Sequence, residues 1–289
     1  MKALWLTSFR PIGNSKINDL YQSIFVDSVK ALDFDICFSL TQFDEANVKD
    51  FVKKKKIKNF YINISKKKLP KGKKYSNKIM LDFALNQYLN NKGFTYLIFS
   101  TADIVVPSNL FKVLSKINLK NFCGLVYPNT QVKNGKLKYS FWPYYGIDLI
   151  IFKIDKTKAK QFKRIIASYN QYDWGIIENF YIAICEILKI KKINLFKEMN
   201  VIKFENDFES FSEDRSWQIN SWKLNQKYFL NFLRKNNLSS LYAYGSYYYL
   251  LYKIFNFKDL NFNLLLAYII FYPFNLSKKF FGIMKKILL

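Results

Sequence analysis

A short apolar strand that ends in a single carboxylate is the sequence feature that most constrains the fold of this chain. Residues 96–99, YLIF, are followed by Ser-Thr-Ala, then by Asp103 and a β-branched run that closes on Pro107. Such a run, bounded by turn residues, is typical of a central strand in a covered sheet. Asp103 then lies just past the carboxyl end of the strand, where open α/β sheets bind ligands. The alternative for Asp103 is a cap for a helix that begins near residue 108.

Strand-like and helix-like segments alternate on both sides of this strand, with short links between them. This alternation predicts parallel strands. We therefore expect an α/β fold with a Rossmann-like, doubly wound sheet. The predicted strands are residues 3–8, 35–41, 59–64, 96–99, 122–127, 149–152, 192–196 and 201–204, with a hairpin turn at 134–135. The predicted helices are residues 18–32, 44–56, 76–91, 108–117, 157–169 and 171–188.

The C-terminal part of the chain has a different composition. After residue 215 it is rich in Asn, Tyr, Leu and Lys and shows no clear strand pattern. We expect one α/β domain over residues 1–215 and a helical C-terminal extension over residues 216–289.

The lack of histidine narrows the chemistry open to the chain. The 289 residues include no histidine and three widely spaced cysteines. Ser-His and Cys-His nucleophilic machinery and His-ligated metal sites are excluded, so proton transfer must use Asp, Glu, Tyr or Lys. The cysteines, Cys37, Cys123 and Cys185, have apolar neighbours and are typical of buried thiols in a reducing compartment.

The formal net charge is +25, and it has two compatible explanations. A lysine-rich coding habit loads surfaces with lysine, and an anionic partner such as a nucleotide, a nucleic acid or a membrane attracts a basic protein. The predicted loop over residues 66–74 holds six lysines around one proline and one glycine. It is either solvated surface or a region that attracts phosphate, and it lacks the glycine-rich cradle of a P-loop.

Several elements, in chain order, resemble nucleotide-sugar-dependent glycosyltransferases of the GT-A fold, particularly bacterial members that build surface polysaccharide. The polar pair Asn77-Lys78 opens the helix before the central strand, and Thr101-Ala-Asp103 is similar to the family's Asp-x-Asp element. Further along, the glycine-acid element Gly146-Ile-Asp148 precedes the next apolar strand, and the acidic segment at residues 172–179 opens a later helix. The resemblance covers about residues 1–215.

The resemblance implies a donor-binding set and a set of catalytic candidates. The donor-binding candidates are Asp103, Thr101, Lys78, Asn77 and Ser8. The catalytic candidates are Asp148, as a contact to a sugar hydroxyl, and Asp173 and Glu178, as bases for an inverting displacement. Three of these residues also have a structural alternative: Lys78 as a solvated lysine at a helix start, Asp148 as a turn residue and Asp173 as a helix N-cap. Four aromatics could stack on sugar or base or belong to the core, namely Trp142, Tyr144, Tyr145 and Trp174.

The resemblance also implies a divalent cation, Mn²⁺ or Mg²⁺, with Asp103 as its ligand. The chain departs from the family here, because Thr101 replaces the first acid of the pair and no histidine completes a metal shell near residues 204–207. A hard cation needs several oxygen ligands. The alternative is a metal-free site in which lysines and an arginine hold the diphosphate.

The end of the chain indicates attachment to a membrane surface. Residues 264–274 are apolar but shorter than the roughly 20 residues of a spanning helix. From residue 276, four lysines fall on one side of a helical projection and apolar residues on the other, which is typical of an interfacial anchor; a helix that packs on its own domain is the alternative. Residues 1–6 look like a strand start rather than a secretory leader. We therefore expect a cytoplasmic protein, peripheral on the inner membrane face.

The predicted function is transfer of a sugar from a nucleotide-sugar donor to a glycan or lipid-linked acceptor in surface polysaccharide synthesis. One alternative is a basic nucleic-acid-binding protein, but no recognition motif supports it, and we expect no nucleic-acid partner. The other is a sugar nucleotidyltransferase. Such enzymes have a glycine-rich loop after the first strand, whereas residues 8–13 contain one glycine.

Overall fold

The computed structural model describes residues 2–128, 130–133, 135–139, 147–173, 177–195, 197–204 and 215–238. The chain divides into two compact units, Met1–Ala243 and Tyr244–Leu289, and the second lies outside the described residues together with the predicted amphipathic tail. Within the described ranges, no helix combines the length and apolarity that crossing a membrane requires. The predicted domain boundary after residue 215 stays a prediction, and the first unit includes the helix that follows it.

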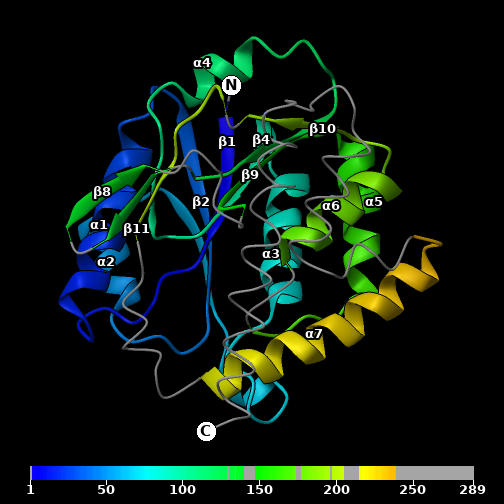
Figure 1. The fold of residues 1–289 in the computed structure, drawn as a ribbon, viewed down its shortest axis with the longest axis horizontal. Coiled ribbons are helices and arrows are strands. Elements are labelled where there is room, and N and C mark those ends of the chain that lie inside the picture. Colours follow the sequence, from blue (N-terminus) through cyan, green and yellow to red (C-terminus); the bar gives the residue numbers. More distant parts are fainter. Residues whose placement is uncertain are drawn as a thin grey trace, which may run out of the picture. The chain divides into compact units, whose positions relative to one another are not determined.

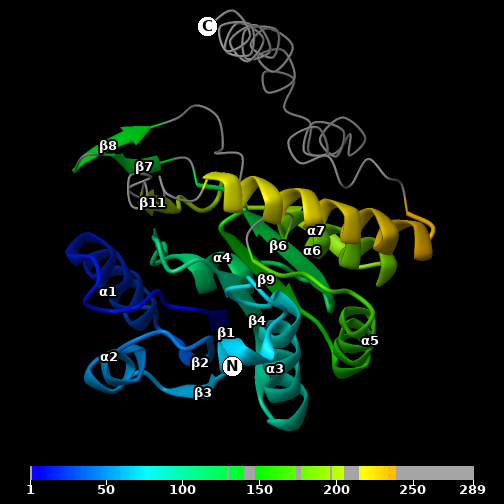
Figure 2. The same ribbon diagram turned by 90° about the horizontal axis from the view of Figure 1, so that it is seen from below.

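A seven-stranded sheet forms the centre of the first unit (Figures 1 and 2). Its strand order is β10-β6-β9-β4-β1-β2-β3. The strands are β1 (Lys2–Thr7), β2 (Asp35–Gln42), β3 (Asn59–Asn63), β4 (Phe94–Ser100), β6 (Phe122–Val126), β9 (Leu149–Lys153) and β10 (Lys191–Asn194). The predicted α/β class and the central position of the strand before Asp103 are confirmed.

One strand departs from the predicted parallel arrangement. β9 runs antiparallel to both of its neighbours, β4 and β6, whereas the other strands share one direction. A parallel return needs a crossover connection, usually a helix. The described connection between β6 and β9 instead contains a hairpin, so the prediction of a wholly parallel sheet is wrong at β9.

A second, four-stranded sheet lies beside the carboxyl end of β4. Its order is β5-β11-β7-β8, with β5 (Ile104–Val105), β7 (Thr130–Lys133), β8 (Lys136–Tyr139) and β11 (Ile202–Phe204). The β7–β8 hairpin was predicted, and Gly135 in its turn has a φ of +71°, a conformation that favours glycine. The predicted strand at residues 201–204 is present as β11, but it belongs to this second sheet. The sheet itself was not predicted, because its pairings join segments far apart in the chain.

Helices cover both faces of the large sheet. α1 (Lys16–Lys30), α2 (Val48–Lys54) and α4 (Leu110–Ser115) contribute to the core on one face. On the other face, ring contacts join Phe99 of β4 to Phe152 of β9 and to Tyr181 of the sixth helix. The helices on that side are α3 (Asn77–Asn90), α5 (Lys156–Ala167) and α6 (Ile177–Ile187), and the remaining helices are η1 (Lys66–Lys68) and α7 (Arg215–Lys235).

Local caps decide where several of these helices begin. The Ser76 hydroxyl accepts from the Ile79 amide at 3.4 Å at the start of α3, and Asp155 Oδ1 accepts from the Lys158 amide at 2.9 Å at the start of α5. These are side-chain N-caps, which satisfy amides that have no partner within the helix. In α1 the cap is Ser15, so the helix starts two residues before the predicted Asn18.

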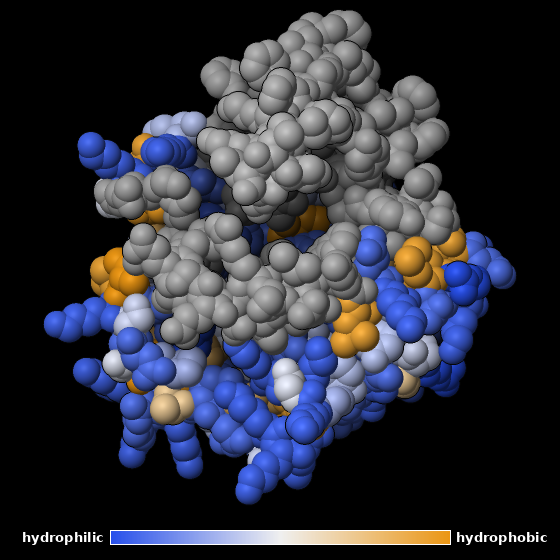
Figure 3. Space-filling view, turned by 60° about the horizontal axis from the view of Figure 1, so that its bottom comes forward, coloured by the Kyte–Doolittle hydropathy of each residue, from blue (hydrophilic) through white to orange (hydrophobic). Residues whose placement is uncertain are grey.

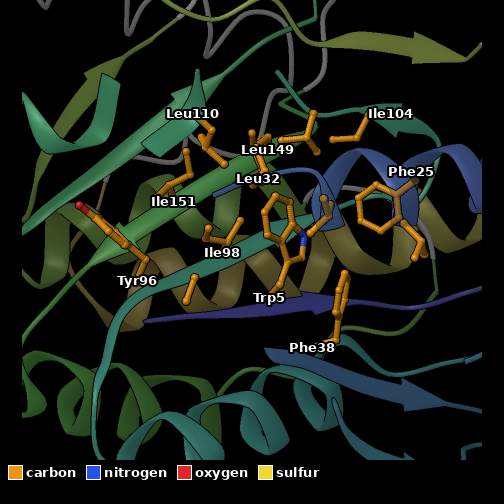
Figure 4. Packing of buried hydrophobic residues seen from close by; sticks show 14 of the residues in the cluster. Trp5, Phe25, Leu32, Phe38, Tyr96, Ile98, Ile104, Leu110, Leu149 and Ile151 are labelled. Carbon is orange, nitrogen blue, oxygen red and sulfur yellow. The ribbon is translucent and has the colours of Figure 1, made fainter. Parts of the chain in front are cut away.

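The core on the α1 side combines aliphatic side chains with aromatic rings from the strands and from α1 (Figure 4). Trp5 of β1 is fully buried, and its ring lies 6.2 Å from that of Phe25 in α1 and 6.3 Å from that of Phe38 in β2. The Trp5 indole also donates to the Ser100 hydroxyl at 2.8 Å. Buried aromatic pairs in edge or offset geometry add to the free energy of area burial, and here they tie β1, β2 and α1 together beneath the end of β4.

The three thiols are buried, and the described surface is mostly hydrophilic. Cys37, Cys123 and Cys185 are buried and free, as predicted. The described surface seen in Figure 3 is mostly hydrophilic and carries separate hydrophobic patches. The high lysine content is therefore largely displayed on the outside.

Phe25 offers a test of this core. Phe25→Ala removes a fully buried ring and leaves a cavity, so we expect it to lower the free energy of unfolding by about 3–5 kcal/mol. Leu20→Ala in the same helix is the control, because Leu20 is 52% exposed and its truncation should cost less than about 1 kcal/mol. Urea denaturation measures both values. Equal losses in the two variants would contradict the assignment of the core.

Candidate active site

Asp103 lies where the chain passes from the large sheet to the small one. β4 ends at Ser100 and β5 begins at Ile104, so residues 101–103 form the link. The Thr7 hydroxyl donates to the Ser100 carbonyl at 3.1 Å, and the Phe204 amide donates to the Asp103 carbonyl at 2.8 Å. The predicted position of Asp103 past the carboxyl end of the central strand is confirmed, and both sheets hold its backbone.

Asp148 reaches the same point from the neighbouring strand. β9 pairs with β4 so that Leu149 lies opposite Ser100, which places Asp148 beside Thr101. The Thr101 hydroxyl donates to Asp148 Oδ1 at 3.5 Å. Asp148 is only 4% exposed, so its carboxylate needs partners to remain charged.

Lys203, which was not among the predicted site residues, is the ion-pair partner of Asp148. Its Nζ lies 2.5 Å from Asp148 Oδ1. Lys203 belongs to β11, where it pairs with Ile104, the residue after Asp103. The small sheet thus delivers a cation to the two carboxylates at the end of β4. Only the pairing of β5 with β11 reveals it, because lysine in a basic chain carries no signal by itself.

Burial and charge together shift the carboxyl groups of this cluster. Burial raises the pKa of Asp148; the Lys203 charge opposes the rise, and the Asp103 charge adds to it. Burial also raises the pKa of Glu178, and the negative charge of Asp148 raises it further. Glu178 is the second residue of α6 and is half-buried. Three of the predicted carboxylates are therefore close enough to influence one another.

Arg10 supplies a second cation, from the loop after β1. Its backbone amide donates to Gln22 Oε1 at 2.6 Å and its Nη1 donates to Asn18 Oδ1 at 3.4 Å, so α1 orients it. Burial lowers the pKa of Arg10, and its attractive interaction with Asp103 opposes that change. Sequence analysis did not name Arg10. A weak signal existed, because it is one of four arginines in a lysine-rich chain and it lies in the first βα loop.

Tyr75 is a further residue that sequence analysis missed. Burial raises the pKa of its hydroxyl far above the usual range, and the charges of Asp173 and Glu178 add to the rise, while Arg10 opposes it. Tyr75 therefore has charged neighbours from the first βα loop, from α6 and from the segment before α6. Its neutral hydroxyl is available as a hydrogen-bond donor near these groups.

Asp173 occupies a different kind of place from the other predicted acids. It is fully buried with a φ of +58°, and its Oδ1 accepts from the amides of Lys74 at 2.7 Å and Tyr75 at 3.3 Å. Its Oδ2 lies 3.4 Å from Lys73 Nζ, and its carbonyl accepts from the Asn77 side-chain amide at 3.2 Å. These contacts favour a structural role for Asp173, and for Asn77 as its partner, over that of a base or a donor contact.

The remaining predicted donor contacts are divided. Lys78 donates from Nζ to the Ala167 carbonyl at 2.8 Å and to Asn170 Oδ1 at 3.3 Å. It thereby stabilises the C-terminal end of α5 instead of turning toward Asp103. Ser8 and Thr101 are exposed and directly follow β1 and β4, so their hydroxyls can face a ligand at that edge. The aromatics Trp142, Tyr144, Tyr145 and Trp174, Gly146 and residues 205–207 lie outside the described residues.

The donor set of the cluster was tested against a divalent cation. No group of three His, Cys, Asp or Glu side chains in the described ranges could hold a metal ion. Asp103, the predicted ligand, has Asp148 as its nearest acidic partner in the cluster, and Asp148 Oδ1 is engaged by Lys203. Among the described residues, Asp103, Asp148 and Glu178 are therefore not grouped as ligands of one cation, and Arg10 and Lys203 bring positive charge to the same cluster.

Comparisons with known proteins agree with the fold. No family model matches the chain, and no curated protein matches it in sequence. Its structure is similar to that of TarS from S. aureus in complex with UDP-GlcNAc, with a TM-score of 0.53 and 11% identity over 84% of this chain and 69% of that one. The predicted GT-A-like fold is therefore confirmed.

Two other solved structures match less extensively. Drosophila β1,4-galactosyltransferase 7, in complex with manganese, UDP-Gal and xylobiose, gives a TM-score of 0.35 at 10% identity over 67% of this chain and 64% of that one. The 4-diphosphocytidyl-2C-methyl-D-erythritol synthase of Anaerococcus prevotii gives 0.42 at 11% identity over 67% and 86%.

Asp173 allows the structural and catalytic roles to be separated. Asp173→Ala leaves two backbone amides and Lys73 without their acceptor, so we expect the free energy of unfolding to fall by about 3–5 kcal/mol. Asp173→Asn keeps one acceptor oxygen and should lose clearly less, while retaining most of any activity of the protein. Denaturant titration and an activity assay test both variants. A stable Asp173→Asn variant without activity would instead make Asp173 a base.

Glu178 gives a test of the carboxylate cluster through pH. Its raised pKa means that the folded protein binds this proton more tightly than the unfolded chain does. The stability contributed is therefore present at low pH and is lost as the pH rises from the ordinary value of 4.5 through the folded value. Glu178→Gln should be more stable than the wild type near neutral pH, and the difference should vanish in acid.

The control for this measurement is Glu198→Gln, because Glu198 is exposed and lies outside the cluster. Its denaturation curves should follow those of the wild type at every pH. A Glu178→Gln variant that is less stable than the wild type at neutral pH would contradict the electrostatic account of the cluster.

Proposed function

We propose that this protein is a glycosyltransferase that moves a sugar from a nucleotide-sugar donor to an acceptor hydroxyl. The observation that carries this proposal is the meeting of Asp103, Asp148 and Glu178 with the cations Arg10 and Lys203 at the carboxyl end of β4. In open α/β sheets this edge is where ligands bind. Paired cations suit a diphosphate, and carboxylates suit sugar and ribose hydroxyls.

The donor side of the site is assigned to the residues between β1 and β4. Arg10 interacts with Asp103, Lys203 pairs with Asp148, and both cations are proposed to hold the diphosphate. Positive charge placed there stabilises the leaving group as its charge develops. Asp103 is proposed to bind a ribose hydroxyl, with the exposed hydroxyls of Thr101 and Ser8 as further contacts.

The acceptor side is assigned to Glu178. Transfer breaks the bond between the anomeric carbon and the diphosphate oxygen and forms a bond to the acceptor oxygen, whose proton must be removed. A carboxylate whose pKa is raised above its ordinary value is a stronger base for that step than an ordinary one. Glu178 has such a shift, whereas Asp173 is committed to backbone amides. Asp148, held by Lys203, is proposed to orient the sugar.

The setting of the reaction is also a proposal. The basic amphipathic pattern at residues 276–287 and the net charge of +25 support attachment to the inner face of the cytoplasmic membrane. A lipid-linked or glycan acceptor of surface polysaccharide synthesis suits an enzyme at that position.

Asp103→Asn is the direct test. The substitution keeps the size of the side chain but removes its charge, and we expect transfer to fall by about 100-fold or more while the melting temperature stays near that of the wild type. Asp50→Asn on the exposed side of α2 is the control and should retain full transfer. Assays contain Mn²⁺, Mg²⁺ or EDTA, because Asp103 is also the residue that was predicted to hold a cation.

The donor is found by thermal-shift measurements with a panel of nucleoside diphosphates and nucleotide sugars, since a ligand of the folded state raises the melting temperature. Full transfer by the Asp103→Asn variant would refute the assigned role of Asp103. Pyrophosphate release from a nucleoside triphosphate and a sugar phosphate, without transfer, would instead identify a nucleotidyltransferase.

A further inference from the structure

A groove lies between α3 and α5, away from the site described above. It has a volume of about 650 Å³, and the two helices that form it run side by side (Figure 2). α3 contributes neutral side chains from its last turns, and α5 contributes its cationic face. The lining residues are Asn86, Leu89, Asn90, Lys156, Lys160, Lys163, Arg164 and Ala167.

The four cations of the groove occupy one face of α5. Lys156, Lys160 and Arg164 follow one another at four-residue intervals, and Lys163 lies beside them, so they are neighbours on the helix surface. Like charges at this spacing destabilise a helix. A helix that collects four cations toward one hollow therefore bears a cost that a bound anion would remove.

The hydrogen bonds of these cations go to neutral acceptors and not to carboxylates. Lys163 Nζ donates to Asn86 Oδ1 at 2.5 Å, and Lys156 Nζ donates to the Leu89 carbonyl at 3.5 Å. No carboxylate lines the groove, and none of the ion pairs between described residues involves the four cations. Elsewhere on the surface, lysines do find carboxylates, as in the 2.7 Å contact between Lys55 and Asp27. The groove thus keeps its full positive charge.

The groove is separate from the proposed donor site. α3 ends before β4 begins, and α5 starts after β9, which runs opposite to β4. Asn90 and Lys156 therefore lie toward the end of the sheet where β4 begins, whereas Asp103 lies at the end where β4 stops. The two helices are antiparallel, because Lys78 at the start of α3 contacts Ala167 at the end of α5. The diphosphate of a donor at the carboxyl end of β4 cannot also fill this groove.

We propose that the α3–α5 groove is a binding site for closely spaced phosphate groups, as in a phosphate polymer or a layer of anionic lipid headgroups. Lysine and arginine donors suit phosphate oxygens, and the Asn90 side chain adds a neutral donor to the lining. The site adds an anion-binding surface to this protein that does not depend on its transfer chemistry.

The test compares two double variants with the same loss of charge and the same helical spacing. Lys160→Gln with Arg164→Gln removes two exposed cations from the groove. Lys49→Gln with Lys53→Gln removes two exposed lysines from α2 and is the control. Binding of the full-length protein to inorganic tripolyphosphate is measured by calorimetry near physiological salt, and binding to phosphatidylcholine vesicles with and without phosphatidylglycerol by co-sedimentation.

We expect the groove variant to bind tripolyphosphate about tenfold more weakly than the wild type, and the control to stay within about twofold. A matching loss on phosphatidylglycerol vesicles supports the site with lipid headgroups as the source, and a loss with tripolyphosphate alone supports it with a soluble phosphate polymer. Equal losses in both variants would mean diffuse attraction to net charge and would overturn the proposal, as would no loss in the groove variant. Unchanged melting temperatures show that both variants are folded.

Discussion

The ion pair between Lys203 and Asp148 joins the two sheets at the point where β4 ends, and the candidate site depends on it. Lys203 comes from the small sheet, and Asp148 comes from the start of an inner strand of the large one. The backbone hydrogen bond between Phe204 and Asp103 fixes the same junction. Because both charged groups are largely buried, removing one partner would leave an uncompensated charge, at a cost of about 3–5 kcal/mol. Stability and site geometry therefore rest on one contact.

The carboxylates around this ion pair are removed from water, which costs free energy when they are charged. Burial raises the pKa of both Asp148 and Glu178, and the charge of Asp103 adds to the rise at Asp148 as that of Asp148 does at Glu178. A cluster of like charges destabilises the folded state, and such arrangements are common where a protein trades stability for function. Arg10 and Lys203 offset part of this repulsion. A diphosphate would compete for both cations, so ligand binding and the protonation of the acids should be coupled.

Asp173 and Asn225 fix the segments that surround the candidate site. Asp173, in the segment before α6, accepts hydrogen bonds from the amides of Lys74 and Tyr75 and so joins that segment to the one around Tyr75. The Asn225 side chain in α7 then holds Tyr172 by accepting from its amide at 3.3 Å and donating to its carbonyl at 2.6 Å. Together these hydrogen bonds hold Tyr75 near Arg10 and Glu178. An acidic residue beside a catalytic candidate can thus have a structural role, and similarity to a motif does not distinguish the two.

The sequence by itself determined the order and type of most elements of the large sheet and of its covering helices, the burial of the three thiols and the position of Asp103 after the central strand. These depend on apolar periodicity and on caps a few residues away, which are local properties of the chain. Tertiary structure decided the reversed direction of β9, the small sheet and the placement and contacts of Arg10, Tyr75, Lys203 and Asp173. Lys203 and Asp148 are 55 residues apart in the chain, and their charges meet only after strand pairing has brought them together. A lysine in a lysine-rich sequence carries no local signal of such a meeting, because its partner is chosen by the register of distant strands.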